Sequence, residues 1–171
     1  MPYIPAPGEL SGVPDARRVE PKNRRRRWVD RRGRIFEWDY QHGTVKVYDR
    51  RGRHLAEYDP LTGARRSGPE SDTTHGAMTG IVTHRLVGYD RASGYVAVEH
   101  DVPERFLELA KKVAKVGPDD PPAVLCYRLN ASQAQRLATA IGAEIDPDRW
   151  NFHFEGFAEQ ALGLDGDRLP D

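Results

Sequence analysis

The stretch from Arg17 to Arg34 constrains this chain most, because ten of its 18 residues are basic and only two are acidic. Such a density of cations is typical of a solvated arm or of a surface that binds polyanions such as nucleic acid. Residues 1–77 (the first half) carry a net charge of +5, and residues 78–171 (the second half) carry −5. The sequence therefore indicates two complementary partners in one chain, or a nucleic-acid binder with its own acidic cover.

Several classes of protein are excluded by what the sequence lacks. No apolar run approaches the roughly 18 residues that a membrane span needs, and the N-terminus lacks the apolar stretch of a secretory signal. Cys126 is the single cysteine of the chain, which excludes an internal disulfide framework and a cysteine-based zinc site. His84, His100 and His153 lie on separate segments without ligand spacing. We expect no metal and no cofactor.

The first half predicts a small, twisted antiparallel β-meander over residues 24–70. Before it, residues 1–23 hold five of the 13 prolines and are predicted to form an extended arm or linker. Alternation typical of strands covers residues 34–39, 43–49 and 53–59, and the segments between them carry turn signals.

The second half, over residues 80–171, predicts an α+β domain with an antiparallel sheet and two helices. A polar, glycine-containing linker over residues 71–79 precedes it. The predicted elements are a hairpin over 81–90 and 94–101, a helix that starts at Pro103, a strand over 123–129, a helix over 131–141 and a strand over 150–157. The fold class is therefore α+β in two units.

The last predicted strand divides its side chains between two faces. Trp150, Phe152 and Phe154 alternate with polar residues and should face the domain core. The residues between them would then face solvent or a partner.

Asp39, His42 and Tyr48 are the polar residues of the first half that could carry chemistry. A histidine can accept or donate a proton near neutral pH, and a nearby carboxylate can orient it. Among arginines, such a group could cleave RNA through attack of its own 2′-OH. A hydrogen-bonded Asp–His pair without catalytic function is the common alternative.

The first half carries several motifs of a known protein family. The segments RRRRW, WDYQHG and HLAEYDPLTG, with YIPAP upstream, resemble the cytotoxic ribonuclease domain of the ribosome-inactivating colicins and cloacin over residues 3–70. Members of that family cleave one phosphodiester in small-subunit ribosomal RNA. The resemblance implies that Asp39 and His42 occupy catalytic positions and that Tyr48 is an active-site tyrosine. The implied RNA-binding residues are Arg24, Arg25, Arg26, Arg27, Arg31, Arg65 and Arg66.

Two departures from the family pattern leave catalysis open. Lys46 stands where the family usually carries a catalytic glutamate, and a lysine acts as a base near neutral pH only if its pKa is strongly lowered. The family's catalytic arginine has no counterpart near Thr73, although Arg65 or Arg66 could replace it.

The second half resembles cloacin-type immunity proteins in two patches, VGYDRASGYVAVEH and GAEIDPDRWNFHFEGFAE. Such proteins are small and acidic, and they bind the cognate nuclease beside its active site. The resemblance predicts that this half binds the first through a charge-complementary surface and keeps it from the ribosome. The implied contact residues are Tyr89, Asp90, Glu99, Asp146 and Glu155.

The preferred hypothesis is a toxin ribonuclease fused to its immunity domain, with the ribosome and small-subunit ribosomal RNA as its target. Its site of action would be the bacterial cytoplasm, and the full-length toxin could be secreted. One alternative is a catalytically degenerate nuclease fold that binds RNA or protein. Another is a regulatory RNA-binding protein whose acidic half inhibits its basic half.

Overall fold

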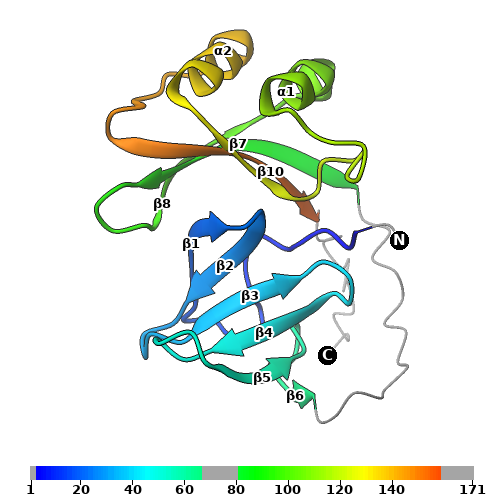
Figure 1. The fold of residues 1–171 in the computed structure, drawn as a ribbon, viewed down its shortest axis with the longest axis vertical. Helices are drawn as coiled ribbons and strands as arrows, with labels where there is room; N and C mark the ends of the chain where they lie inside the picture. The colour runs from blue at the N-terminus through cyan, green and yellow to red at the C-terminus, as the bar shows by residue number, and fades with distance from the viewer. Residues whose placement is uncertain (1–2, 67–80, 159–171) are drawn as a thin grey trace, which may run out of the picture.

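The computed structural model describes residues 3–66 and 81–158, which form two antiparallel sheets and two α-helices (Figure 1). The predicted linker over residues 71–79 and the end of the chain after residue 158 lie outside the described residues. The α+β fold with a β-meander is confirmed.

The first half forms a six-stranded meander in which each strand pairs with the next along the chain. Its turns contain aspartates whose carboxylates accept backbone N–H groups, as Asp49 does from Arg51 and Arg53 at 2.9 Å each. The strands are β1 (Arg17–Lys22), β2 (Arg25–Val29), β3 (Ile35–Asp39), β4 (Thr44–Tyr48), β5 (His54–Tyr58) and β6 (Arg65–Arg66).

The start of the chain differs from the extended arm that the prolines predict. Arg17–Lys22 forms strand β1 on β2, and the segment before it is packed against both halves. Ala6 is fully buried, and its carbonyl oxygen accepts the N–H of Ala158 at 3.0 Å. Trp38 donates its indole N–H to the carbonyl of Ile4 at 2.9 Å. Proline has no N–H to donate, so this segment does not form a regular strand. It is held by side chains, by the second half, and by backbone hydrogen bonds from Ile4 to Tyr40 at 2.7 Å and from Gly12 to Pro60 at 3.0 Å.

The second half is a four-stranded sheet in the order β8-β7-β10-β9, with both helices on one face (Figure 1). Asn130 forms a capping box with Gln133, and Gly142 ends the second helix in the left-handed conformation with φ of 72°. The elements are β7 (Val82–Asp90), β8 (Val96–Asp101), η1 (Glu104–Phe106), α1 (Leu107–Ala114), β9 (Cys126–Leu129), α2 (Ala131–Ile141) and β10 (Trp150–Ala158).

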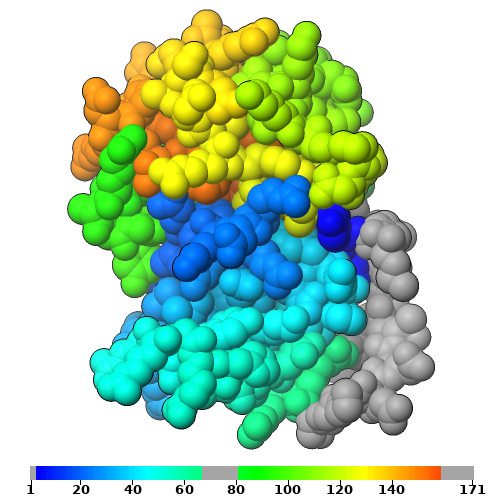
Figure 2. Space-filling model, viewed as in Figure 1, coloured from blue at the N-terminus to red at the C-terminus, as the bar shows by residue number. Residues whose placement is uncertain are grey.

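Strand β10 buries both of its faces. Phe152 and Phe154 join the hydrophobic cluster that contains buried residues of both helices. His153 and Glu155 point the other way, toward the first half, where each contacts a residue of that half. The two halves therefore pack directly on each other, with β1 and β2 against the helix-free face of the second sheet (Figures 1 and 2).

Truncation of Phe152 tests this packing. Its side chain is 2% exposed, so Phe152→Ala should lower the free energy of unfolding by about 3–5 kcal/mol through lost burial and the cavity left behind. Urea denaturation of the full chain measures the change. A loss below about 1 kcal/mol would show that this face of β10 is not in the core.

Among the described residues, no helix is long and apolar enough to cross a membrane.

Candidate active site and the contact between the halves

Asp39 is the centre of the candidate active site. It ends β3, is 4% exposed, and lies opposite Thr44 at the start of β4. Its Oδ2 atom lies 3.0 Å from Nδ1 of His42 and 2.7 Å from Nζ of Lys46, while Oδ1 accepts the N–H of Gln41 at 2.9 Å. The tight β3–β4 turn and the register of the two strands thus bring together three of the predicted site residues.

The electrostatics of this cluster favour its charged forms. Burial by itself would raise the pKa of Asp39, but hydrogen bonds from Lys46 and His42 outweigh burial and hold this pKa well below its usual range. The hydrogen bond to Asp39 raises the pKa of Lys46 above its ordinary value. Lys46 therefore remains a cation near neutral pH and does not act as a base.

His42 is the solvent-facing member of the cluster. Its side chain is 65% exposed, while Nδ1 is held by Asp39. Nε2 is then the ring nitrogen available to a substrate, which is the arrangement that a proton-transfer histidine needs. Tyr48 lies on the same face of β4 as Lys46. Its ring meets the ring of His54 edge-on, with the ring centroids 5.4 Å apart.

The predicted RNA-binding arginines lie in different environments. Arg26 is fully buried against the second half, and Arg24 reaches Asp119 of the second half at 3.3 Å. Arg25 and Arg27 lie 3.3 and 3.7 Å from Glu37 on β3. Arg31 and Arg65 are exposed and Arg66 is partly exposed, and the side chains of Arg24 and Arg25 also remain about half exposed in spite of their ion pairs.

The pair Arg26–Glu155 is the centre of the contact between the halves. Both side chains are fully buried, and the guanidinium lies 2.7 Å from the carboxylate. The carboxylate also accepts the Tyr89 hydroxyl at 2.6 Å, and Arg26 donates to the carbonyl of Gly156 at 3.0 Å. Burial alone would raise the pKa of Glu155, but the Arg26 charge keeps it below its ordinary value.

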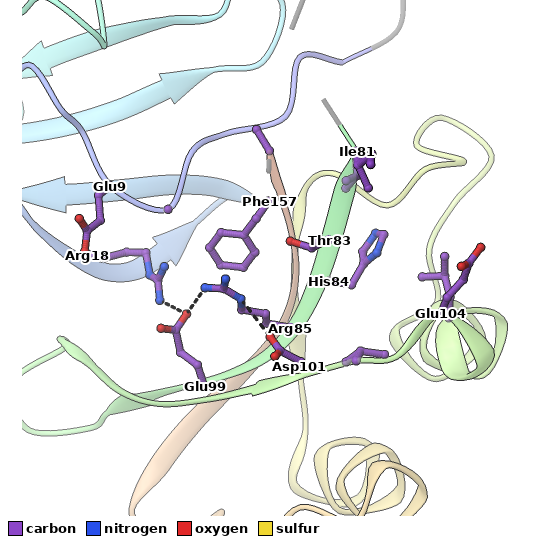
Figure 3. Close-up of a pocket in the computed structure, with 15 residues that line it drawn as sticks. Glu9, Arg18, Ile81, Thr83, His84, Arg85, Glu99, Asp101, Glu104 and Phe157 are labelled. Atoms are coloured by element: carbon purple, nitrogen blue, oxygen red, sulfur yellow. Dashed lines mark hydrogen bonds and ion pairs between the residues drawn. The ribbon is translucent and has the colours of Figure 1, made fainter. Parts of the chain in front are cut away.

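A second cluster surrounds Phe157 on the same face of β10. The guanidinium carbons of Arg26, Arg85 and Arg18 lie 3.6, 4.6 and 5.0 Å from the ring centroid, within the range of cation–π contacts. Arg18 and Arg85 also converge on Glu99 at the edge of a pocket between the halves (Figure 3). Glu99 neutralises part of this concentration of positive charge.

The predicted contact residues thus fall into two groups. Tyr89, Glu99 and Glu155 lie in the contact, whereas the carboxylates of Asp90 and Asp146 accept N–H groups of their own turns. Arg18, Glu20 and Phe157 also belong to the contact, although no sequence pattern had singled them out. The period-two pattern of β10 could have indicated Phe157, since it shares a face with Glu155.

The Glu20–His153 contact predicts a pH dependence. The hydrogen bond from His153, 3.0 Å away, lowers the pKa of Glu20 below its ordinary value of 4.5. A lowered carboxyl pKa contributes stability that is complete above pH 4.5 and is lost as pH falls through the folded-state value.

We expect the full chain to lose about 1 kcal/mol from this contact in acid, and Glu20→Gln to lack that loss. Unfolding free energies of the two proteins between pH 7 and pH 3 isolate the effect, because all other carboxylates are common to both. Parallel pH curves would contradict the assignment.

Burial raises the pKa of the Cys126 thiol to about 12, so this cysteine is a neutral core group. Among the residues that the structure describes, no cluster of histidine, cysteine and carboxylate side chains could hold a metal ion.

Comparisons with known proteins match the two halves of the chain separately. Residues 4–75 match the family model described as Cytotoxic, and residues 83–155 match one described as a domain of unknown function (DUF7683). Colicin E3 of Escherichia coli is 38% identical over 79 residues, and cloacin of Escherichia coli is 34% identical over 79 residues. Each alignment covers 40% of this chain and 14% of the relative.

No solved structure matches the chain. The second half carries a family description without a function. The comparisons therefore support a colicin-type cytotoxic domain over residues 4–75.

Proposed function

We propose that the first half is a toxin endoribonuclease that acts on small-subunit ribosomal RNA, and that the second half is an immunity domain that holds it inactive. The observation that carries the proposal is the fully buried Arg26–Glu155 pair, which joins the basic strand β2 to the acidic half. A buried ion pair fixes which surfaces meet more than it adds stability. Such a pair suits a partner that recognises one particular nuclease.

The candidate site supports cleavage of a phosphodiester by the neighbouring 2′-OH. His42, oriented by Asp39, would transfer a proton, and the Lys46 ammonium would stabilise negative charge on the phosphate. Arg31, Arg65 and Arg66 would attract the RNA backbone. With ribosomal RNA as its substrate, the enzyme would act in the bacterial cytoplasm.

The second half would inhibit the first by preventing it from docking to the ribosome. The second half contacts β1, β2 and the N-terminal segment, while the His42 side chain stays 65% exposed. Of the arginines that it engages, Arg18 and Arg26 are buried and therefore unavailable to ribosomal RNA, and Arg24 is paired with Asp119.

The test uses a chain with a protease cleavage site inserted within residues 67–80. We expect the intact chain to leave purified ribosomes unchanged, and the cut chain, after removal of the second half, to cleave small-subunit RNA once. A first half that binds ribosomes without cleaving them would overturn the nuclease proposal.

That last outcome is the prediction of the second candidate, a degenerate nuclease fold that binds RNA or protein. The observation in its favour is Lys46, which occupies the family glutamate position and remains protonated beside Asp39. Under this alternative the first half remains inactive even after the halves are parted.

A further inference from the structure

One row of charged residues crosses five strands of the first sheet. Their backbones are paired in register, each residue opposite the next, and the charges alternate in sign. Side chains opposite each other on adjacent strands share one face of the sheet. This charge row consists of Arg27, Glu37, Lys46, Glu57 and Arg66.

The ion pairs do not follow the row. Lys46 lies opposite Glu57, but its ammonium binds Asp39 at 2.7 Å. Glu37 has Arg25 and Arg27 within 4 Å. Within residues 3–66 and 81–158, Glu57 forms no ion pair, and its carboxylate accepts the hydroxyl of Thr44.

This hydrogen bond ties Glu57 to the candidate active site. Thr44 lies opposite Asp39 on β3, and it shares a face of β4 with Lys46. Thr44 therefore holds the carboxylate of Glu57 on the face of the sheet that carries Lys46, beside the strand position of Asp39. Because Thr44 occupies Oε1, Oε2 is the oxygen available to accept a proton.

We propose that Glu57 on β5 is the general base of this site. It would replace the glutamate that the family usually carries on β4 at the position of Lys46. The inference rests on the proposed ribonuclease function. Lysine at position 46 and glutamate directly opposite at position 57 retain one carboxylate and one cation on adjacent strands.

The reaction balances with the residues present. Glu57 takes the proton of the ribose 2′-OH as this oxygen forms a bond to phosphorus, and His42 gives a proton to the 5′-oxygen as its bond to phosphorus breaks. The products are a 2′,3′-cyclic phosphate and a 5′-hydroxyl. Lys46 balances the charge that develops on the phosphate oxygens.

The experiment uses the full chain and a short single-stranded RNA oligonucleotide, which can reach the exposed His42 without removal of the second half. Glu57→Gln should lower the cleavage rate by about 10²–10⁴-fold, and Glu57→Asp should retain part of the activity. Glu37→Gln is the matched control, since Glu37 flanks Lys46 on the other side and is paired with arginines. It should leave the rate unchanged.

The pH profile separates catalysis from a structural role. A carboxylate base must be ionised, so the wild-type rate should fall in acid, and the variant Glu57→Gln should lose this acid limb. A double exchange, Lys46→Glu with Glu57→Lys, should restore more activity than Glu57→Gln retains. The same variants are also tested for cleavage of ribosomal RNA in purified ribosomes, after the chain has been cut within residues 67–80 and the second half removed.

The outcomes distinguish the two claims. If cleavage depends on His42 while Glu57→Gln and Glu37→Gln behave alike, Glu57 is not the base and the ribonuclease function stands. If the wild-type chain cleaves neither the oligonucleotide nor, once cut, ribosomal RNA, the proposed function fails and the role of Glu57 fails with it.

Discussion

Replacing Glu155 with glutamine should destabilise the full chain by about 3–5 kcal/mol, because the substitution leaves the Arg26 charge buried without its counter-ion. A fully buried guanidinium has no access to water, and the cost of its desolvation is recovered mainly through an opposite charge at hydrogen-bond distance. Urea denaturation of the full chain, followed by tryptophan fluorescence, measures the loss. Trp28 and Trp38 report on the first half and Trp150 on the second.

A double replacement provides the control. Arg26→Met with Glu155→Leu removes both charges and retains apolar volume, and we expect it to recover most of the lost stability. A cost below about 1 kcal/mol for Glu155→Gln alone would show that the two side chains are not buried together.

His42→Ala should reduce ribosomal RNA cleavage by the separated first half by about 10²–10⁴-fold, since a positioned acid–base group is removed. Gln41→Ala is the matched control. Gln41 is exposed in the same turn, and it contacts Asp39 through its backbone N–H, which the substitution keeps. Gel analysis of ribosomal RNA after timed incubation measures both. Equal activity of the His42→Ala and Gln41→Ala variants would exclude His42 from the chemistry.

Local patterns explain why much of the fold follows from the sequence. The helix over 131–141 is bounded as predicted because Asn130 and Gly142 set its ends by short-range hydrogen bonds. Likewise, the alternation of aromatic and polar residues over 150–157 correctly separates the core face, with Phe152 and Phe154, from the face toward the first half. These features depend on neighbours within a few residues.

The position of β1 and the burial of Arg26 do not follow from local patterns. A strand with three cations and a proline has no apolar alternation. Strand β1 forms because β2 pairs with it and because Arg18 and Glu20 contact Glu99 and His153 of the second half. Arg26 is separated from Glu155 by 129 residues along the chain, so no window of sequence contains both. An arginine run predicts exposure unless its distant acidic partner is known.

In the candidate site, too, some contacts follow from local sequence and others depend on strand pairing. Asp39 and His42 are three residues apart, and their contact can be anticipated from one turn. The contact of Lys46 with Asp39 depends on the register of β3 and β4, and the approach of Glu57 to Thr44 depends on the register of β4 and β5. Period-two counting gives the face of each strand but not which residues of two strands lie opposite each other.

Titration of the separated first half with the second half tests the central claim most directly. Cleavage of small-subunit RNA in purified ribosomes is measured at increasing amounts of residues 79–171. We predict that cleavage ends at one equivalent of the second half. Raised salt should weaken this inhibition, because Arg24 and Asp119 are about half exposed and Glu99, the partner of Arg18, is partly exposed. Cleavage that continues unchanged in excess second half would contradict this prediction.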